Sequence, residues 1–219
     1  MTRRRIIIVD DHPLFRSALR QTLAAGDPAI VVEEAGDLTG LAAALEADRD
    51  CDLVLLDLNM PGSHGFSGLL LLRAQFPEVP VMIVSAVEQG TVIRRAFELG
   101  AAGYLSKSVE PAEIRRAIET VLSGEIFVPE GVILETADAQ SALLRRLSSL
   151  TPQQVRVLMM LKDGLMNKQI AYELSISEAT VKAHVSAILQ KLDVDSRTQA
   201  VILAQHLEQG QFDEIPSVT

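Results

Sequence analysis

The chain has 219 residues but only one cysteine, Cys51, and this scarcity limits its chemistry. A single thiol cannot form an internal disulfide, and it cannot build a metal centre from several thiolates. The sequence therefore excludes a disulfide-stabilised scaffold and a thiolate metal site. We expect Cys51 to be a buried, unreactive thiol.

Long apolar runs are also missing. No stretch approaches the roughly 18 residues that a membrane-spanning helix needs. Arg3, Arg4 and Arg5 resemble the start of a signal peptide, but only four apolar residues follow before Asp10, too few for the apolar core of such a signal. We therefore expect a globular protein of the cytoplasm with no membrane partner.

Positive charge is scarce, and its distribution is uneven. The formal net charge is -9; residues 1–150 carry 14 basic and 21 acidic side chains, whereas residues 151–208 carry six of each. The second block therefore repels polyanions less than the first. Because it is neutral rather than basic, a nucleic-acid site there would need a local cluster of cations and two copies of the chain.

Apolar sequence is plentiful, at 48% of the residues, and its pattern through residue 124 indicates an α/β domain. Strands apolar at every position are covered on both faces, which is typical of a parallel sheet with helices on each side. We predict a five-stranded, doubly wound (flavodoxin-like) domain over residues 1–124. Its strands are expected near 5–9, 29–33, 53–56, 80–84 and 102–105, and its helices near 13–25, 38–48, 65–75, 89–99 and 110–123.

A second, all-α domain is predicted over residues 150–212. Residues 125–149 lose the β/α rhythm and are expected to be a linker, with a possible helix near 137–147, and residues 213–219 a tail. Thr151, Pro152 and Gln154 combine a helix N-cap, a proline at the first helical position and a glutamine three residues after the cap. Four helices are expected, near 152–163, 167–174, 178–192 and 196–208, and the tight turn between the second and third suggests helix-turn-helix.

The third of these helices has two distinct faces. One is an apolar stripe that we expect to pack inward: Val181, Val185, Ile188 and Leu192. The other presents small, polar or cationic groups that allow close approach to a DNA groove: Thr180, Lys182, Ala183, Ser186 and Gln190.

Acidic residues stand where predicted strands of the first domain end. Asp10 and Asp11 follow one strand, and Asp57 follows another. The carboxyl ends of parallel strands lie at one edge of the sheet, so these side chains should converge. Two carboxylates about 4 Å apart repel by roughly 4 kcal/mol at an effective dielectric near 20, which calls for a cation. Mg²⁺ fits best, and Asp57 could then be a nucleophile that forms an aspartyl phosphate.

Three further residues can reach the same edge. Lys107 can pair with phosphoryl oxygens, and the Ser85 hydroxyl can donate a hydrogen bond to one of them. The ring of Tyr104 can be either buried in the domain or exposed to solvent, so we expect its position to depend on that of Ser85. The four histidines of the chain, in contrast, show no metal-ligand spacing: His12, His64, His184 and His206.

The motifs of both domains resemble one family, the NarL/FixJ-class two-component response regulators. The receiver domain of that family is resembled by Asp10-Asp11-His12-Pro13-Leu14-Phe15-Arg16, Leu56-Asp57-Leu58-Asn59-Met60-Pro61-Gly62 and Gly100-Ala101-Ala102-Gly103-Tyr104-Leu105-Ser106-Lys107-Ser108. Its LuxR-type helix-turn-helix is resembled by Leu150-Thr151, Gly164-Leu165-Met166-Asn167-Lys168-Gln169-Ile170-Ala171 and Ile176-Ser177-Glu178-Ala179-Thr180-Val181-Lys182-Ala183-His184.

The resemblance implies roles for residues at matching positions. Asp57 would accept a phosphoryl group from a sensor histidine kinase, with Mg²⁺ held by Asp10, Asp11, Asp57 and the backbone carbonyl of Asn59. Ser85 and Tyr104 would be the switch pair and Lys107 the phosphate contact. Double-stranded DNA would be read through Lys182, Ala183 and Ser186, with backbone contacts from Asn167, Lys168, Thr180 and Arg197. The fourth helix would pair two copies after activation, and no turnover enzyme is expected.

Other interpretations remain open at this point. Asp10 and Asp11 alone could be turn or cap acids, and the third helix could belong to a structural hairpin. A phosphatase-like hydrolase is disfavoured because Asn59 leaves no general acid two residues after Asp57. A phosphorylation-independent regulator with the same fold is a second alternative. Many receivers have proline after the lysine, so Ser108 leaves the geometry of that loop open.

Overall fold

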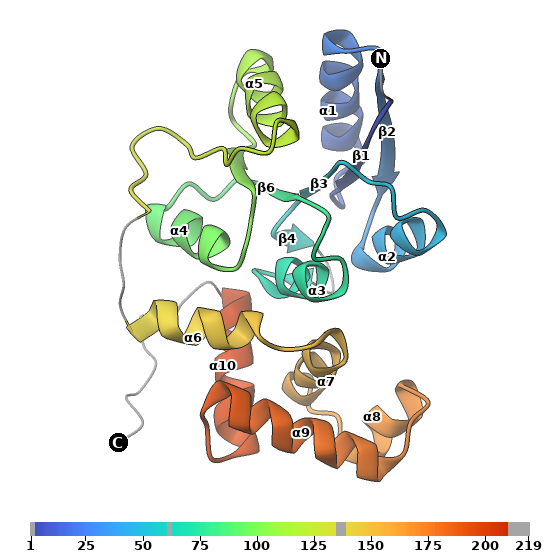
Figure 1. The fold of residues 1–219 in the computed structure, drawn as a ribbon, viewed down its shortest axis with the longest axis vertical. Helices are drawn as coiled ribbons and strands as arrows, with labels where there is room; N and C mark the ends of the chain where they lie inside the picture. Colours follow the sequence, from blue (N-terminus) through green and yellow to red (C-terminus); the bar gives the residue numbers. More distant parts are fainter. Residues whose placement is uncertain (1–2, 61–62, 135–138, 210–219) are drawn as a thin grey trace.

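The computed structural model describes residues 3–60, 63–134 and 139–209 (Figure 1). Five parallel strands form one sheet in the order β2-β1-β3-β6-β7. They are β1 (Arg4–Val9), β2 (Ile30–Ala35), β3 (Leu53–Leu56), β6 (Val81–Ser85) and β7 (Gly103–Ser106). The prediction of a five-stranded parallel sheet is confirmed, and the observed order makes β1 and β3 direct neighbours.

Five helices cover the two faces of this sheet (Figure 1). They are α1 (Pro13–Gly26), α2 (Leu38–Ala47), α3 (Ser67–Gln75), α4 (Gly90–Glu98) and α5 (Pro111–Leu122). Buried residues of α1 and α5 share one cluster with one face of the sheet, and those of α2, α3 and α4 share another with the opposite face. The doubly wound architecture is therefore also confirmed.

Strand β1 shows why its sequence is apolar at every position. Ile6 and Ile8 pack on the α1 and α5 side, whereas Ile7 and Val9 pack on the other side. Successive strand residues point to opposite faces, so a sheet covered on both faces needs apolar residues in both sets. All four side chains are fully buried.

The second domain consists of helices only. They are α6 (Ala139–Ser148), α7 (Pro152–Lys162), α8 (Asn167–Glu173), α9 (Glu178–Leu192) and α10 (Arg197–Gln209). Helices α7 to α10 are the four predicted ones, and α6 lies within the segment predicted as a linker, close to the possible helix there. The predicted tail, residues 213–219, lies outside the described residues.

Two local signals in the sequence are realised in the backbone. Gly124, beyond the end of α5, has φ +88°, a left-handed conformation that favours glycine. At the start of α7, the Thr151 hydroxyl accepts a hydrogen bond from the Gln154 amide, and the Gln154 side-chain oxygen accepts one from the Thr151 amide. This reciprocal cap fixes the first residue of α7.

A short antiparallel pair of strands was not predicted. β4 (Asn59–Met60) pairs with β5 (Ser63–His64), directly after Asp57. Strands of two residues are too short to show a hydrophobic period. The hairpin lies between β3 and α3 in the chain, and β5 contacts α10 of the helical domain.

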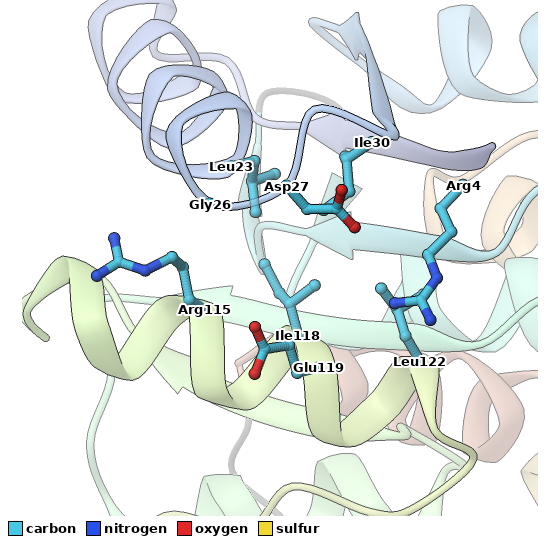
Figure 2. A pocket seen from close by; sticks show the side chains of 9 residues that line it. All are labelled: Arg4, Leu23, Gly26, Asp27, Ile30, Arg115, Ile118, Glu119 and Leu122. Atoms are coloured by element: carbon cyan, nitrogen blue, oxygen red, sulfur yellow. The ribbon is translucent and has the colours of Figure 1, made fainter. Parts of the chain in front are cut away.

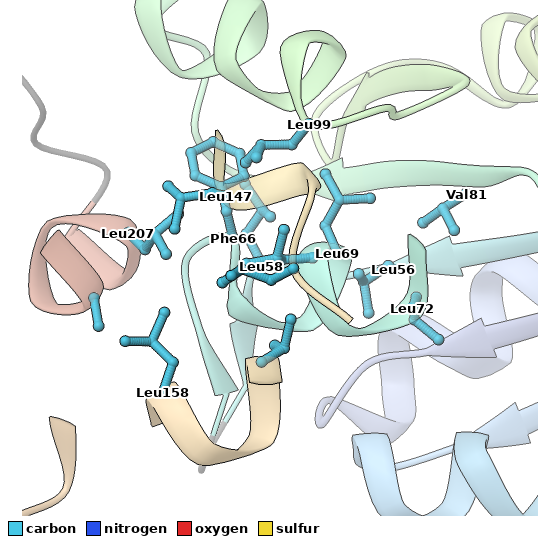
Figure 3. Close-up of a cluster of buried hydrophobic side chains, with 14 of the residues drawn as sticks. Leu56, Leu58, Phe66, Leu69, Leu72, Val81, Leu99, Leu147, Leu158 and Leu207 are labelled. Atoms are coloured by element: carbon cyan, nitrogen blue, oxygen red, sulfur yellow. The ribbon is translucent and has the colours of Figure 1, made fainter. Parts of the chain in front are cut away.

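The two domains share a buried apolar contact. Figure 3 shows Phe66 and Leu58 of the first domain beside Leu147, Leu158 and Leu207 of the second. The Phe66 amide donates a hydrogen bond of 3.2 Å to the Leu207 carbonyl. The hydrophobic core therefore continues from the sheet face covered by α2, α3 and α4 into α6, α7 and α10.

One cavity of about 210 Å³ lies between α1 and α5 (Figure 2). Arg4 and Ile30 place it at the amino ends of β1 and β2, opposite the edge where the acids stand. Within the described ranges, no helix is long and apolar enough to cross a bilayer.

Candidate functional site

The acids predicted to converge are brought together by neighbouring strands. Asp10 follows β1 and Asp57 follows β3, and the Asp57 amide donates to the Val9 carbonyl at 2.9 Å. Asp10 and Asp57 are 1% and 3% exposed, and Asp11 is half-buried beside them. Two carboxylates at this depth repel each other strongly, so the arrangement requires positive charge close by.

Lys107 supplies one such charge. Its Nζ lies 2.6 Å from Asp10 Oδ2 and 2.8 Å from Asp57 Oδ2. Burial lowers the pKa of the Lys107 ammonium, but its contacts with the Asp10 and Asp57 carboxylates and their negative charge outweigh burial, so its pKa lies above the ordinary value. The Lys107 amide donates to the Ser85 carbonyl at 2.8 Å, which anchors this residue at the end of β7. A cation bridging two acids is thus held at the strand ends.

The same carboxylates form an acidic cluster that could bind a metal ion. Possible ligand atoms of Asp10, Asp11, His12 and Asp57 all lie within 4.8 Å of one another. Asp10 Oδ2 and Asp11 Oδ1 are buried and lack a hydrogen-bond partner of good geometry among the described residues. Oxygen atoms of this kind are ligands that Mg²⁺ prefers, so the donor set fits such an ion. The Asn59 amide donates to Asp57 Oδ1 at 3.2 Å, which turns this part of the backbone toward the cluster.

The histidines show no metal-ligand spacing in the sequence, but the structure places His12 beside the acids. Its Nδ1 lies 2.8 Å from Asp11 Oδ1 and 3.1 Å from Asp10 Oδ1. The spacing rule failed because it looks for histidines paired with each other, whereas His12 joins acids adjacent in sequence. That adjacency was the available signal.

The cluster opens into a cleft of about 400 Å³. Its lining residues are His12, Leu14, Phe15, Asp57, Asn59, Ala86 and Lys107. These residues come from the start of α1 and its N-cap, from β4, and from positions just after β3, β6 and β7. A small anionic group could enter here and reach both Asp57 and Lys107.

The predicted switch residues lie next to each other beneath this cleft. Ser85 is fully buried, and its Oγ accepts a hydrogen bond from the Val87 amide at 3.2 Å. Tyr104 lies inward, 1% exposed, with its hydroxyl donating to the Val87 carbonyl at 2.6 Å. Val87 therefore connects the two side chains, a link that spacing alone does not reveal.

A second set of contacts joins the same two loops at the surface. The hydroxyls of Ser106 and Ser108 donate to Glu88 Oε1 at 2.5 and 2.6 Å, and these hydrogen bonds lower the pKa of Glu88. The described residues contain no cis peptide bond, so the bond between Lys107 and Ser108 is trans. Serine at position 108 thus places a hydroxyl in this network.

We expect the free energy of unfolding to fall at alkaline pH because a thiol and a phenol, those of Cys51 and Tyr104, are buried in the folded protein. Burial raises the pKa of Cys51 to about 11 from 9.0 and that of Tyr104 to about 12 from 10.0. Each group loses its proton at a lower pH in the unfolded chain than in the folded protein. Its contribution to the free energy of unfolding is therefore complete below pH 9 and is lost between about pH 9 and 12, by roughly 2 kcal/mol per group. Urea unfolding at pH 8 and pH 10.5 measures the loss. A Cys51→Ala, Tyr104→Phe double variant should show a smaller loss, and an equal loss would contradict the assignment.

The predicted reading helix has the expected two faces. Val181, Ile188 and Leu192 are buried in the domain core, while Lys182 and Ser186 are exposed. Thr180 and Ala183 are exposed on the same side, and Lys168 is exposed on α8. Lys182 Nζ lies 3.1 Å from Glu178 Oε1, one turn earlier. This surface ion pair is weak, so Lys182 is available to a phosphate or a base.

Two predicted DNA-backbone contacts have partners inside the domain. Arg197 donates to the Asn167 side-chain oxygen at 3.0 Å and to the Leu165 carbonyl. These bonds tie the start of α10 to the start of α8. Asn167 and Arg197 therefore have a structural role that sequence reasoning did not foresee.

Comparison with known proteins gives the class of the chain. Residues 6–119 match the response regulator receiver domain, and residues 148–204 match the bacterial regulatory proteins of the luxR family. The chain belongs to the two-component response regulators that join a receiver domain to a LuxR-type DNA-binding domain. The resemblance drawn from the motifs is thereby confirmed. A receiver domain implies a kinase as partner, and a LuxR-type domain implies DNA.

Individual relatives cover both domains. The chain is 42% identical over 216 residues to the glycerol metabolism activator of Pseudomonas putida, covering 93% of this chain and 96% of that protein. It is 39% identical over 201 residues to the nitrate/nitrite response regulator protein NarP of Escherichia coli (strain K12), covering 90% and 93%. A solved structure of RcsB from Salmonella enterica serovar Typhimurium, 24% identical, matches with a TM-score of 0.57 over 96% of this chain and 100% of that chain. The last match supports the fold alone.

Proposed function

We propose that this response regulator is controlled by phosphorylation of Asp57. The carrying observation is the placement of Asp57: it is buried, paired with Lys107 at 2.8 Å, and reached from a cleft beside Asp10. A receiver domain over residues 1–124, a linker over 125–149 and a DNA-binding domain over 150–212 would then carry signal and response. The donor would be the phosphohistidine of a sensor histidine kinase, and the protein would act in the cytoplasm, where chromosomal DNA is found.

In the proposed transfer, an Asp57 oxygen attacks phosphorus while the bond between phosphorus and the imidazole nitrogen breaks. The electron pair leaves with the imidazole, which takes up a proton, and the product is an aspartyl phosphate. The Lys107 ammonium would exchange its hydrogen bond to the Asp57 carboxylate for one to a phosphoryl oxygen. The Ser85 hydroxyl would donate a hydrogen bond to a second phosphoryl oxygen. The phosphoryl group ends on the protein itself, so the protein would promote its own phosphorylation and would not turn over a separate substrate.

Mg²⁺ is the metal that we assign to the acidic cluster. Asp10, Asp11, Asp57 and the backbone carbonyl of Asn59 would hold it, and the ion would neutralise the charge of the incoming phosphoryl group. Lys107 remains bonded to the cluster from the other side. Three carboxylates, the Lys107 ammonium and the ion would together carry no net charge before transfer, and the aspartyl phosphate would leave the site about one unit negative.

The arrangement of the two domains suggests what phosphorylation controls. The receiver packs on α6, α7 and the end of α10, whereas Lys182, Ala183 and Ser186 of α9 are exposed (Figure 1). Activation therefore does not need to uncover the reading face. We propose that it pairs two copies through α10, where Ile202 is exposed, so that two α9 helices read half-sites of duplex DNA about one helical turn apart.

One experiment tests both halves of this function. The protein is incubated with phosphoramidate and Mg²⁺, its mass is recorded, and its affinity is measured for a duplex selected from a random library. We expect the mass gain of one phosphoryl group and tighter DNA binding. Absence of the mass gain would overturn the proposal. A gain that leaves affinity unchanged would instead support the phosphorylation-independent regulator.

A charge-reversed variant separates the two halves. Lys182→Glu should keep the phosphoryl gain but lose about 1–3 kcal/mol of DNA binding, because a phosphate or base contact becomes repulsive. Arg3→Glu makes the same change of charge on an exposed residue of the first domain and should bind DNA like the wild type. Equal losses in both variants would show that net charge, not the α9 face, governs binding.

A further inference from the structure

The cleft above Asp57 contains an aromatic residue that has no part in the chemistry described so far. Phe15, in the first turn of α1, is half-buried and lines the cleft together with Lys107. The Lys107 Nζ lies over its ring, 4.8 Å from the ring centroid. This distance is within the range in which an ammonium is attracted by the negative face of an aromatic ring.

The ring contacts Lys107 in a different way from the carboxylates. Asp57 Oδ2 accepts a hydrogen bond from the ammonium at 2.8 Å, and Asp10 Oδ2 forms an ion pair with it at 2.6 Å. An aromatic face attracts the charge without taking up one specific proton, so it does not compete with a phosphoryl oxygen for a hydrogen bond. When one carboxylate oxygen becomes bonded to phosphorus, the ring can still hold the ammonium while its hydrogen bonds are exchanged.

Both partners stand on anchored backbone. The neighbour of Phe15, Arg16, donates from Nη1 to the Asp10 carbonyl at 2.5 Å and from Nε to Glu34 at 3.1 Å. Lys107 is anchored by the bond of its amide to the Ser85 carbonyl. The stacking of Lys107 on Phe15 is therefore fixed by two separate elements, the start of α1 and the end of β7.

We infer that Phe15 is a positioning residue for Lys107 in phosphoryl transfer to Asp57, acting through the face of its ring. The inference rests on the proposed function, because it assigns Phe15 a role in that reaction. It predicts that an aromatic ring at position 15, rather than an apolar side chain of similar size, sets the rate.

Two substitutions separate the ring from its volume. Phe15→Leu keeps an apolar side chain but removes the aromatic face, and Phe15→Tyr keeps the face. With phosphoramidate and Mg²⁺, we expect Phe15→Leu to gain its phosphoryl group about 2- to 30-fold more slowly at saturating donor, the effect of one cation–π contact. The donor concentration that gives half the maximal rate should not change. Phe15→Tyr should react like the wild type.

A matched control is available in the predicted linker, at a residue that packs on the α1 and α5 face of the receiver. Arg116 lies over the ring of Phe127, 5.7 Å from its centroid, outside the cleft. Phe127→Leu removes an equivalent contact and should not slow the reaction, once urea unfolding shows that each variant is folded.

The outcomes distinguish this inference from the proposed function. If the wild type gains no phosphoryl group, the proposed function fails. The inference alone is overturned if the wild type reacts but Phe15→Leu and Phe15→Tyr react at the same rate as each other. It is also overturned if Phe15→Leu changes only the half-saturating donor concentration.

Discussion

An Asp57→Asn variant is expected to gain no phosphoryl group from phosphoramidate, whatever the Mg²⁺ concentration. The amide has nearly the shape of the carboxylate, so the fold should be kept, but its oxygen is neutral and is not a nucleophile of comparable strength. The loss should therefore be complete, not partial. Intact-protein mass spectrometry with time measures it directly.

A control substitution at a second aspartate shows whether this loss is specific to Asp57. Asp50 is exposed in the loop before β3, and Asp50→Asn should gain the phosphoryl group at the rate of the wild type. If Asp57→Asn still gained one group, another acceptor would be present and the assignment of Asp57 would be wrong.

The same variant reports on the metal. An ion that binds only the folded state raises the midpoint of unfolding by mass action. We expect Mg²⁺ to stabilise the wild type, and to stabilise Asp57→Asn less because one of the three carboxylates is lost. Equal stabilisation of both proteins would place the ion elsewhere.

A Phe66→Ala variant is expected to lose about 3–5 kcal/mol of stability and to weaken the contact between the domains. The ring is 1% exposed, so its removal forfeits apolar burial and leaves a cavity. It packs near Leu147 and Leu207 of the helical domain, and its amide holds the Leu207 carbonyl (Figure 3). Urea unfolding measures the first effect, and faster hydrogen exchange in α10 measures the second.

Phe127→Ala serves as the comparison for this prediction. Phe127 is 7% exposed and belongs to the cluster on the α1 and α5 face, away from the helical domain. Its removal should destabilise the receiver without selectively speeding exchange in α10. Similar exchange in α10 in both variants would show that Phe66 does not couple the domains.

DNA binding by Phe66→Ala also tests how the regulator is controlled. The α9 residues predicted to contact DNA are exposed although the domains are packed together, so loosening the contact should leave the affinity of the unphosphorylated Phe66→Ala variant close to that of the wild type. A large rise in affinity would mean that the receiver covers the DNA-reading face, contrary to the proposal.

The sequence predicted the strands and helices well because their signals are local. Apolar runs such as Leu53–Leu56, the reciprocal cap of Thr151 and Gln154, and the glycine after α5 each act over a few residues. The hairpin β4–β5 escaped because two-residue strands have no period. Asn167 and Arg197, both predicted to contact DNA, also form a hydrogen bond with each other across 30 residues, and no local pattern contains such a pairing.

The amino-acid sequence by itself determined the class of the protein: a doubly wound receiver with acids at its strand ends, followed by a helix-turn-helix domain. Hydrophobic periodicity and helix caps, which are properties of neighbouring residues, indicated the two folds, and the resemblance of the motifs to a known family indicated the class. Only the tertiary structure decided that Phe15 faces Lys107 and that Phe66 joins the two domains. Such contacts depend on distance and orientation between separate side chains, which are set when the elements pack.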